Sequence, residues 1–337
     1  MLTAIVTFVV TMFVVGLALL AQWARKNRSA EITLWIVLLA VSLLVVVIGA
    51  VAGLGLIAKA AGGAVSDSNR IAFVAGGVMA AAAGLVGLGL CVPPLMKIMG
   101  RPPRTAFWAD PPVFLALWLF VVVLANNAVS FLIFTQSSNV GSLFPTSRLS
   151  VGTVAASQLP FIAVGLAGVG LGVRRNFRQT LSRLGYGRIK AKHLILIALF
   201  IVMAFAVSAS ANVLFQTLQP DLARRVGTLS NNLFSPKGLS PVSAVFFALL
   251  IGFGAALGEE TIFRGAIQPV LGIVPTSILF ASMHVQYGPS VLLLFIFLLA
   301  VGLGLLRKHV NTTASFLAHA GYNALGILLA YFVGGGF

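Results

Sequence analysis

Charged residues are scarce in this chain, and acidic residues are the scarcest of all. Only 8% of the 337 residues are charged, only six are Asp or Glu, and 59% are hydrophobic. Soluble domains carry about 25% charged residues, so this composition excludes a soluble globular fold. The apolar residues instead form runs of about 18 or more, and each such run is long enough to cross the hydrocarbon core of a bilayer as a helix.

Regular alternation of polar and apolar residues is also missing from these runs. The run Val113–Phe134 does not alternate, whereas the strands of a membrane β-barrel do. Backbone groups in lipid must bond within their own segment, which a helix allows. We therefore predict an all-α polytopic transmembrane helical bundle of about ten membrane segments, of which the eighth is too short to span the bilayer alone. The predicted segments are 2–23, 32–58, 71–96, 112–134, 150–173, 194–217, 241–271, 275–287, 290–306 and 312–334.

Cysteine is nearly absent, since Cys91 is the single cysteine and lies in an apolar run. An intrachain disulfide is therefore excluded, and we interpret Cys91 as a small core residue. The first apolar run has no positive charge before it and no cleavage signal of small residues. We expect residues 2–23 to be a retained membrane span and not a signal peptide.

Basic residues give the chain a net charge of +16, and their positions indicate membrane orientation rather than nucleic-acid binding. They form no solvated patch interleaved with aromatic residues, so we expect no nucleic-acid partner. Sixteen of the 22 Lys and Arg residues lie in one set of alternate loops. Because cytoplasmic loops carry the excess of Lys and Arg, we expect both termini to lie outside a bacterial cytoplasmic (inner) membrane.

A basic segment, residues 174–193, divides the chain into two parts. It contains seven Lys and Arg residues and no acidic residue, and we expect it to be a cytoplasmic linker on the anionic membrane surface. Residues 1–173 form an N-terminal membrane bundle of about five helices, whose role stays unassigned and which could bind a membrane protein partner. Residues 194–337 form the part in which we expect the chemistry.

Two of the six acidic residues, Glu259 and Glu260, lie inside an apolar segment. A carboxylate at membrane depth costs a few kcal/mol and indicates a functional site. Arg264 stands four residues after Glu260, on the same helical face, whereas Glu259 points about 100° away. We predict that Glu260 pairs with Arg264 and that Glu259 stays available to a cavity.

Three more polar side chains lie in the apolar segments that follow. These are His284, His319 and Asn323, the last being four residues after His319 and so on the same face of its helix. The turn at 272–275 predicts a helical hairpin, with Glu259 and His284 each roughly 15–20 Å from its tip and His319 roughly 10 Å deep. We expect groups from three helices to converge in the cytoplasmic half of the membrane.

This set of side chains suits hydrolysis of an amide by water. Glu259 could take a proton from the water, His284 could hold the water, and His319 with Asn323 could donate to the oxyanion. The zinc-protease motif HExxH is missing, yet a metal such as zinc on Glu259, His284 and His319 stays open, because three ligands and a water suit catalytic zinc. Two other interpretations fit the spacing: a purely structural set of buried polar contacts, and a proton-coupled or ion-coupled transporter.

Three motifs in order, "EETIFRG" at 259–265, "FASMH" at 280–284 and "HAGYN" at 319–323, resemble EExxxR, FxxxH and HxxxN of the CPBP family. This family comprises CAAX prenyl endopeptidases and bacteriocin-processing proteins, also called ABI proteins. The resemblance covers roughly residues 241–330. It implies a CPBP-like catalytic membrane core and an intramembrane glutamic endopeptidase that needs no cofactor.

The resemblance also implies a role for each motif residue. Glu259 would be the general base, supported by the pair Glu260 and Arg264. His284 would bind the water, while His319 and Asn323 would form the oxyanion site. The implied substrate is a membrane-bound or lipidated peptide, and membrane lipids surround the chain. The alternative function is a non-catalytic scaffold or immunity protein that keeps the family core.

Overall fold

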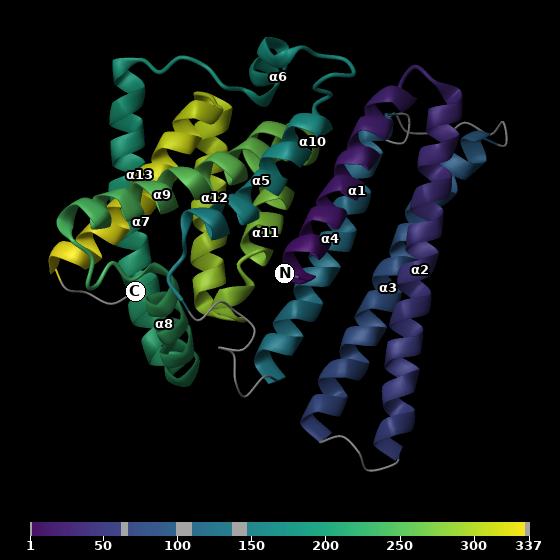
Figure 1. Cartoon of the computed structure of the whole chain (residues 1–337), viewed down its shortest axis with the longest axis horizontal. Helices are drawn as coiled ribbons and strands as arrows, with labels where there is room; N and C mark the ends of the chain where they lie inside the picture. Colours follow the sequence, from purple (N-terminus) through teal and green to yellow (C-terminus); the bar gives the residue numbers. More distant parts are fainter. Residues whose placement is uncertain (1, 62–66, 99–109, 137–146, 334–337) are drawn as a thin grey trace. The chain divides into compact units, whose positions relative to one another are not determined.

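The computed structural model describes residues 2–61, 67–98, 110–136 and 147–333, and the regular structure of these residues is helical (Figure 1). The predicted all-α fold class is therefore confirmed. The α-helices are α1 Leu2–Ala24, α2 Arg28–Ala61, α3 Asp67–Ile98, α4 Pro111–Gln136, α5 Val151–Gly168, α6 Phe177–Leu184, α7 Ala191–Leu218, α8 Pro220–Phe234, α9 Pro241–Glu259, α10 Gln268–Leu271, α11 Ile273–Ser282, α12 Val291–His309 and α13 Thr312–Val333. A π-helix, η3 Glu260–Ile267, and a 3₁₀-helix, η4 Val285–Tyr287, complete the described elements.

Nine of the helices in the described ranges are long and apolar enough to cross a membrane, so the chain is a polytopic integral membrane protein. The predicted segment 275–287 is a shorter apolar helix, Ile273–Ser282, followed by η4. As the sequence predicted, this segment is too short to span the bilayer. Arg101 and Arg104, which contributed to the predicted orientation, lie outside the described residues.

Two helices were not predicted from the sequence. Residues 220–234, expected to be a loop, form the amphipathic helix α8, and part of the linker 174–193 forms α6. In α8 the apolar residues Val226, Leu229 and Leu233 recur at helical spacing and are buried. Because both helices are short and half polar, neither has the continuous apolar run that identifies a membrane span.

The contacts of the chain define two compact units, one of residues Gly16–Ser138 and one of Met1–Val15 with Asn139–Phe337. In the unit of residues 16–138, glycines allow α2 and α3 to approach at backbone distance. A Cβ at Gly77 would lie 2.8 Å from the carbonyl oxygen of Gly49, so no larger residue fits there. The indole of Trp118 on α4 donates to the hydroxyl of Ser42 on α2 (2.9 Å). Small residues and neutral hydrogen bonds are the usual means of packing helices in lipid.

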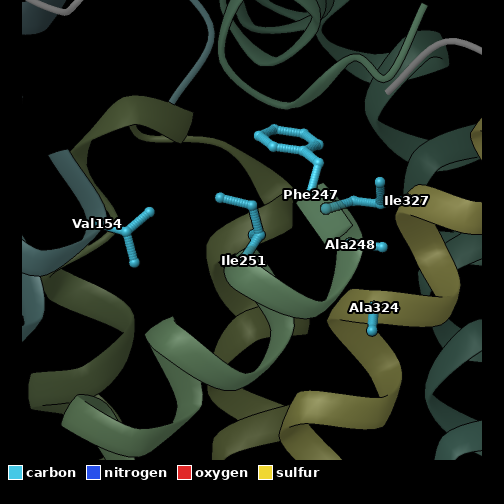
Figure 2. Packing of buried hydrophobic residues seen from close by; sticks show 6 residues of the cluster. All are labelled: Val154, Phe247, Ala248, Ile251, Ala324 and Ile327. Carbon is cyan, nitrogen blue, oxygen red and sulfur yellow. The ribbon is translucent and has the colours of Figure 1, made fainter. Parts of the chain in front are cut away.

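In the other unit, α9 packs between two neighbours. Gly252 and Gly254 point about 200° apart on the helix, and a Cβ at Gly252 would meet Ala324 of α13 (2.8 Å). A Cβ at Gly254 would meet Val154 of α5 (2.7 Å). Figure 2 shows the apolar cluster that results, in which Val154 of α5, Phe247, Ala248 and Ile251 of α9, and Ala324 and Ile327 of α13 pack together. The end of α9 is thereby fixed beside α5 and α13.

Helix α5 was assigned by sequence to the N-terminal part, residues 1–173, but its contacts are with α9 and η3. It lies in the same compact unit as α6 to α13. The functional division at residue 173 stays a prediction.

Candidate active site

The π-helix η3 continues α9 and contains both Glu260 and Arg264, while Glu259 is the last residue of α9. In a π-helix each N–H bonds five residues back, and such segments are rare and frequent at functional sites. The ordinary helical period, on which the sequence predictions rest, does not predict this widened segment. The predicted ion pair is nevertheless present, because Arg264 Nε lies 3.5 Å from Glu260 Oε2 and both side chains are fully buried.

Glu260 has partners on both of its carboxylate oxygens. Its Oε1 accepts a hydrogen bond from His319 Nδ1 (2.9 Å). Its Oε2 accepts from the hydroxyl of Ser315, one turn before His319 on α13. A fully buried carboxylate needs such compensation, since an unpaired charge would be strongly destabilising. Glu260 therefore joins η3 to α13 and fixes the ring of His319.

Arg264 is held by electrostatics more than by hydrogen bonds. None of its three guanidinium nitrogens has a hydrogen-bond partner among the described residues. Its Cζ instead lies 4.9 Å from the ring centroid of Phe280, in a cation–π arrangement. The carboxylate of Glu260 on one side and the aromatic face on the other compensate the buried charge.

His319 lies between the two glutamates. Because Glu260 accepts a hydrogen bond from Nδ1, the other ring nitrogen, Nε2, is left to face Glu259, and it lies 3.9 Å from Glu259 Oε2. This separation is too long for a direct hydrogen bond. The Glu259 side chain is 15% exposed, whereas that of Glu260 is fully buried. Glu259 is thus the accessible carboxylate of the pair, as the sequence predicted.

His284 follows α11 and is not part of a helix, although the sequence predicted a continuous segment over 275–287. Its Nδ1 lies 2.8 Å from the carbonyl oxygen of Phe280. A carbonyl can only accept, so Nδ1 carries the proton, and Nε2 of the neutral ring can accept a hydrogen bond. The Phe280 ring lies 4.9 Å from the ring of His284 and 5.9 Å from that of His319, so Phe280 positions both histidines.

Asn323 lies one turn after His319 on α13 and is half-buried. Its side chain takes part in none of the hydrogen bonds found among the described residues. A donor role for Asn323 stays a prediction that rests on its helical register with His319.

Metal binding was the open alternative for Glu259, His284 and His319. Within the described part of the chain, no group of three or more His, Cys, Asp or Glu side chains is arranged to hold a metal ion. Binding of a metal by Glu259, His284 and His319 stays an open alternative, which the mechanism proposed below does not use.

Two residues that contact this site, Ser315 and Tyr186, were not predicted from the sequence. Ser315 could have been found from its spacing, because it lies four residues before His319 and so on the same helical face. Tyr186 comes from the predicted linker, and its hydroxyl hydrogen-bonds that of Thr261 (2.7 Å), the residue after Glu260. No local pattern indicates this second contact, since the two residues are 75 positions apart.

Comparison with known proteins is consistent with the motifs. Residues 241–325 match the family described as Type II CAAX prenyl endopeptidase Rce1-like. The protein named "Uncharacterized protein YpbD" from Bacillus subtilis (strain 168) is 34% identical over 101 residues, which are 28% of this chain and 50% of YpbD. The chain thus spans about half the length of that curated relative. No solved structure matches the chain. The segment that carries Glu259, Glu260, Arg264, His284, His319 and Asn323 is therefore similar to the CAAX prenyl endopeptidases, and the resemblance seen in the motifs is confirmed.

Proposed function

We propose that this protein is an intramembrane endopeptidase that hydrolyses a peptide bond of a membrane-bound peptide, such as a lipidated one. The observation that supports this proposal most is the position of His319 between two carboxylates of unequal accessibility. Glu260 is fully buried and bonded to the ring, while Glu259 is partly exposed and faces Nε2 from 3.9 Å. A structural ion pair alone would need no second, accessible carboxylate at this depth.

Glu259 acts as the general base in the proposed mechanism. It takes one proton from a water molecule while the water oxygen attacks the carbonyl carbon of the peptide. His284, whose Nδ1 proton is engaged by Phe280, accepts a hydrogen bond from the same water at Nε2 and so orients it. When the C–N bond breaks, Glu259 returns the proton to the leaving nitrogen, which completes the hydrolysis.

His319 stabilises the negative charge that develops on the carbonyl oxygen. To donate from Nε2 while Nδ1 donates to Glu260, the ring must carry both protons and a positive charge. The two neighbouring carboxylates favour this cationic form. Asn323, on the same face of α13, is the second proposed donor, and fixed donors at a developing charge are an effective source of catalysis.

We further propose that cleavage takes place near the cytoplasmic face of a bacterial cytoplasmic membrane, with both termini outside. The support is the bias of basic residues toward one set of loops. We also propose that residues 1–173, of which α5 packs against α9 and η3, bind a membrane protein partner or admit the substrate.

Purified protein in proteoliposomes should cleave one or more members of a membrane-peptide library that includes prenylated peptides. His284→Ala should abolish this cleavage, because the ring no longer orients the water. His309→Ala is the matched control, since His309 is exposed at the end of α12, and it should cleave like wild type. Cleavage that survives a metal chelator supports the glutamate mechanism.

Two outcomes would contradict the proposal. Equal background cleavage by wild type and His284→Ala, across prenylated and unmodified peptides, would favour the non-catalytic scaffold or immunity protein. Flux of protons or ions across the proteoliposome membrane, without cleavage, would favour a transporter.

A further inference from the structure

The segment of residues 173–192, here called the α6 segment, is an ordered part of the protein. Before α6 the chain turns at Gly170 and Gly172, both with positive φ. Asn176 caps the start of α6 by accepting from the N–H of Gln179 (2.9 Å), and Gly185 ends the helix in the left-handed conformation. The segment predicted to be a linker therefore has a fixed conformation, and so a fixed arrangement of exposed side chains.

One side of the α6 segment is docked on the helices that carry the candidate active site. Thr180 and Leu184 are fully buried. The carbonyl oxygen of Leu184 accepts from the hydroxyl of Thr312 (2.6 Å), at the start of α13. Leu184 also lies against η3, where a Cβ at Gly265 would be 2.8 Å from it. The orientation of the α6 segment is thus fixed relative to η3 and α13.

The apolar side of α6 continues beyond this docked part. Phe177 lies two turns before Leu184, on the same side of the helix, yet its side chain is 61% exposed. Val173, four residues before Phe177, is 43% exposed. These two apolar side chains lie outside the membrane-spanning helices. Both remain exposed on the surface of the protein.

The α6 segment that exposes Phe177 is strongly basic. The segment contains seven Lys and Arg residues and no acidic residue, and Arg178, Arg188, Lys190 and Lys192 are exposed. A segment that exposes both apolar side chains and several cations is typical of surfaces that lie in the headgroup region of an anionic membrane. Helix α8 differs, because its apolar face is buried in the protein and its exposed charges include Asp221.

We propose that the α6 segment binds anionic phospholipid headgroups, with Phe177 and Val173 entering the boundary between headgroups and acyl chains. The exposed cations supply the selectivity for anionic lipid, and the two apolar side chains supply the insertion. Since the segment is bonded to η3 through Tyr186 and Thr261, bound lipid holds this end of the candidate active site in place. Lipid binding by the α6 segment does not depend on whether the protein is a peptidase.

A fluorescent probe at position 177 tests the proposal. Cys91→Ser removes the single native thiol, and Phe177→Cys accepts an environment-sensitive fluorophore. The full protein is reconstituted in phosphatidylcholine vesicles with and without phosphatidylglycerol. We expect a blue shift of emission, and quenching by lipids with a shallow nitroxide, that increase when phosphatidylglycerol is present. The matched control carries the probe at Asn232→Cys, on the exposed face of α8, and should not respond to phosphatidylglycerol.

A charge-neutralised variant separates anionic headgroups from other causes. Replacing Arg178, Arg188, Lys190 and Lys192 by Gln should abolish the response of the probe at position 177. Raising the salt concentration should weaken the response, because the Debye length falls to about 3 Å at 1 M. An unchanged melting temperature would show that the variant folds. Emission at 177 that is the same in both lipids, or that is insensitive to the four substitutions, would overturn the proposal.

Discussion

The unit of residues 16–138 and the unit that carries the candidate active site pack their helices in the same way but bury different polar groups. Glycines bring α2 close to α3 in the first unit, and they bring α9 close to α5 and α13 in the second. Among the described residues, the buried polar side chains of the first unit are neutral, namely Gln22, Ser42 and Asn127. The second unit buries the ionisable residues Glu260, Arg264 and His319.

Helix packing in this protein therefore does not require buried charge. Both units achieve close contact through small residues and neutral hydrogen bonds, which is sufficient in lipid. Each buried ionisable group opposes membrane insertion by a few kcal/mol. The concentration of such groups around Glu260 is therefore better explained by the chemistry of the site than by stability.

Replacing a buried charge should have a larger effect on stability than replacing a buried neutral group. Glu260→Gln leaves Arg264 without its carboxylate, and we expect a loss of about 3–5 kcal/mol in the free energy of unfolding. Ser42→Ala leaves the indole N–H of Trp118 without its acceptor, for which we expect about 1–3 kcal/mol. Denaturant unfolding in one detergent measures both. Equal losses for the two variants would show that the buried charge of Glu260 matters no more for stability than a buried neutral group.

Ser315→Ala should give a smaller loss of stability together with a loss of activity. The hydroxyl donates to the Glu260 carboxylate, and hydrogen bonds to charged groups contribute about 1.5–3 kcal/mol. With one donor removed, Glu260 fixes His319 less well, so kcat should fall while KM stays similar. Ser315→Thr keeps a hydroxyl and should restore part of kcat. A variant that loses stability but keeps its full kcat would show that Ser315 is only structural.

The smallest effect on the cleavage rate is expected from glycine substitutions in the unit of residues 16–138. A Cβ at Gly49 would collide with the backbone of α3, whereas one at Gly16 would meet nothing within 4 Å. Gly49→Ala should therefore destabilise the protein by about 1–3 kcal/mol. Gly16→Ala, in the interior of α1, should stabilise it by up to about 1 kcal/mol. The cleavage rate per folded molecule should be unchanged in both variants. A fall in that rate for Gly49→Ala would show that the unit of residues 16–138 contributes to catalysis.

Much of the fold could be predicted from the sequence, because a helix that crosses a membrane needs about 20 consecutive, mostly apolar residues. The spans follow from apolar runs, and the Glu260–Arg264 ion pair follows from helical spacing. The contact between Ser315 and Glu260 joins residues 55 positions apart. It depends on how α13 is aligned with η3, which no local pattern specifies.

The π-helix η3 was also not predicted, because residue types alone do not distinguish it from an α-helix. A π-helix uses the same residue types as an α-helix and differs in which backbone groups are bonded. The π-helix η3 packs against α5, α6 and α13, which lie far from it along the chain or are separated from it by other elements. The docked side of the α6 segment likewise depends on Thr312 and Gly265, which lie far along the chain. Sequence therefore predicted the Glu260–Arg264 pair and the convergence of His319 on the two glutamates, but not the contacts of Ser315 and Tyr186 that hold them.

The most direct test of the account is the cleavage rate of Glu259→Gln compared with Asp221→Asn, both corrected for the folded fraction. Asp221 is an exposed acidic residue on α8, so its substitution makes the same chemical change away from the site. We predict that Asp221→Asn cleaves like wild type, and that Glu259→Gln folds normally but loses about 10²–10⁴-fold in rate, as expected for a missing general base. A folded Glu259→Gln protein that cleaves at the wild-type rate would contradict the account.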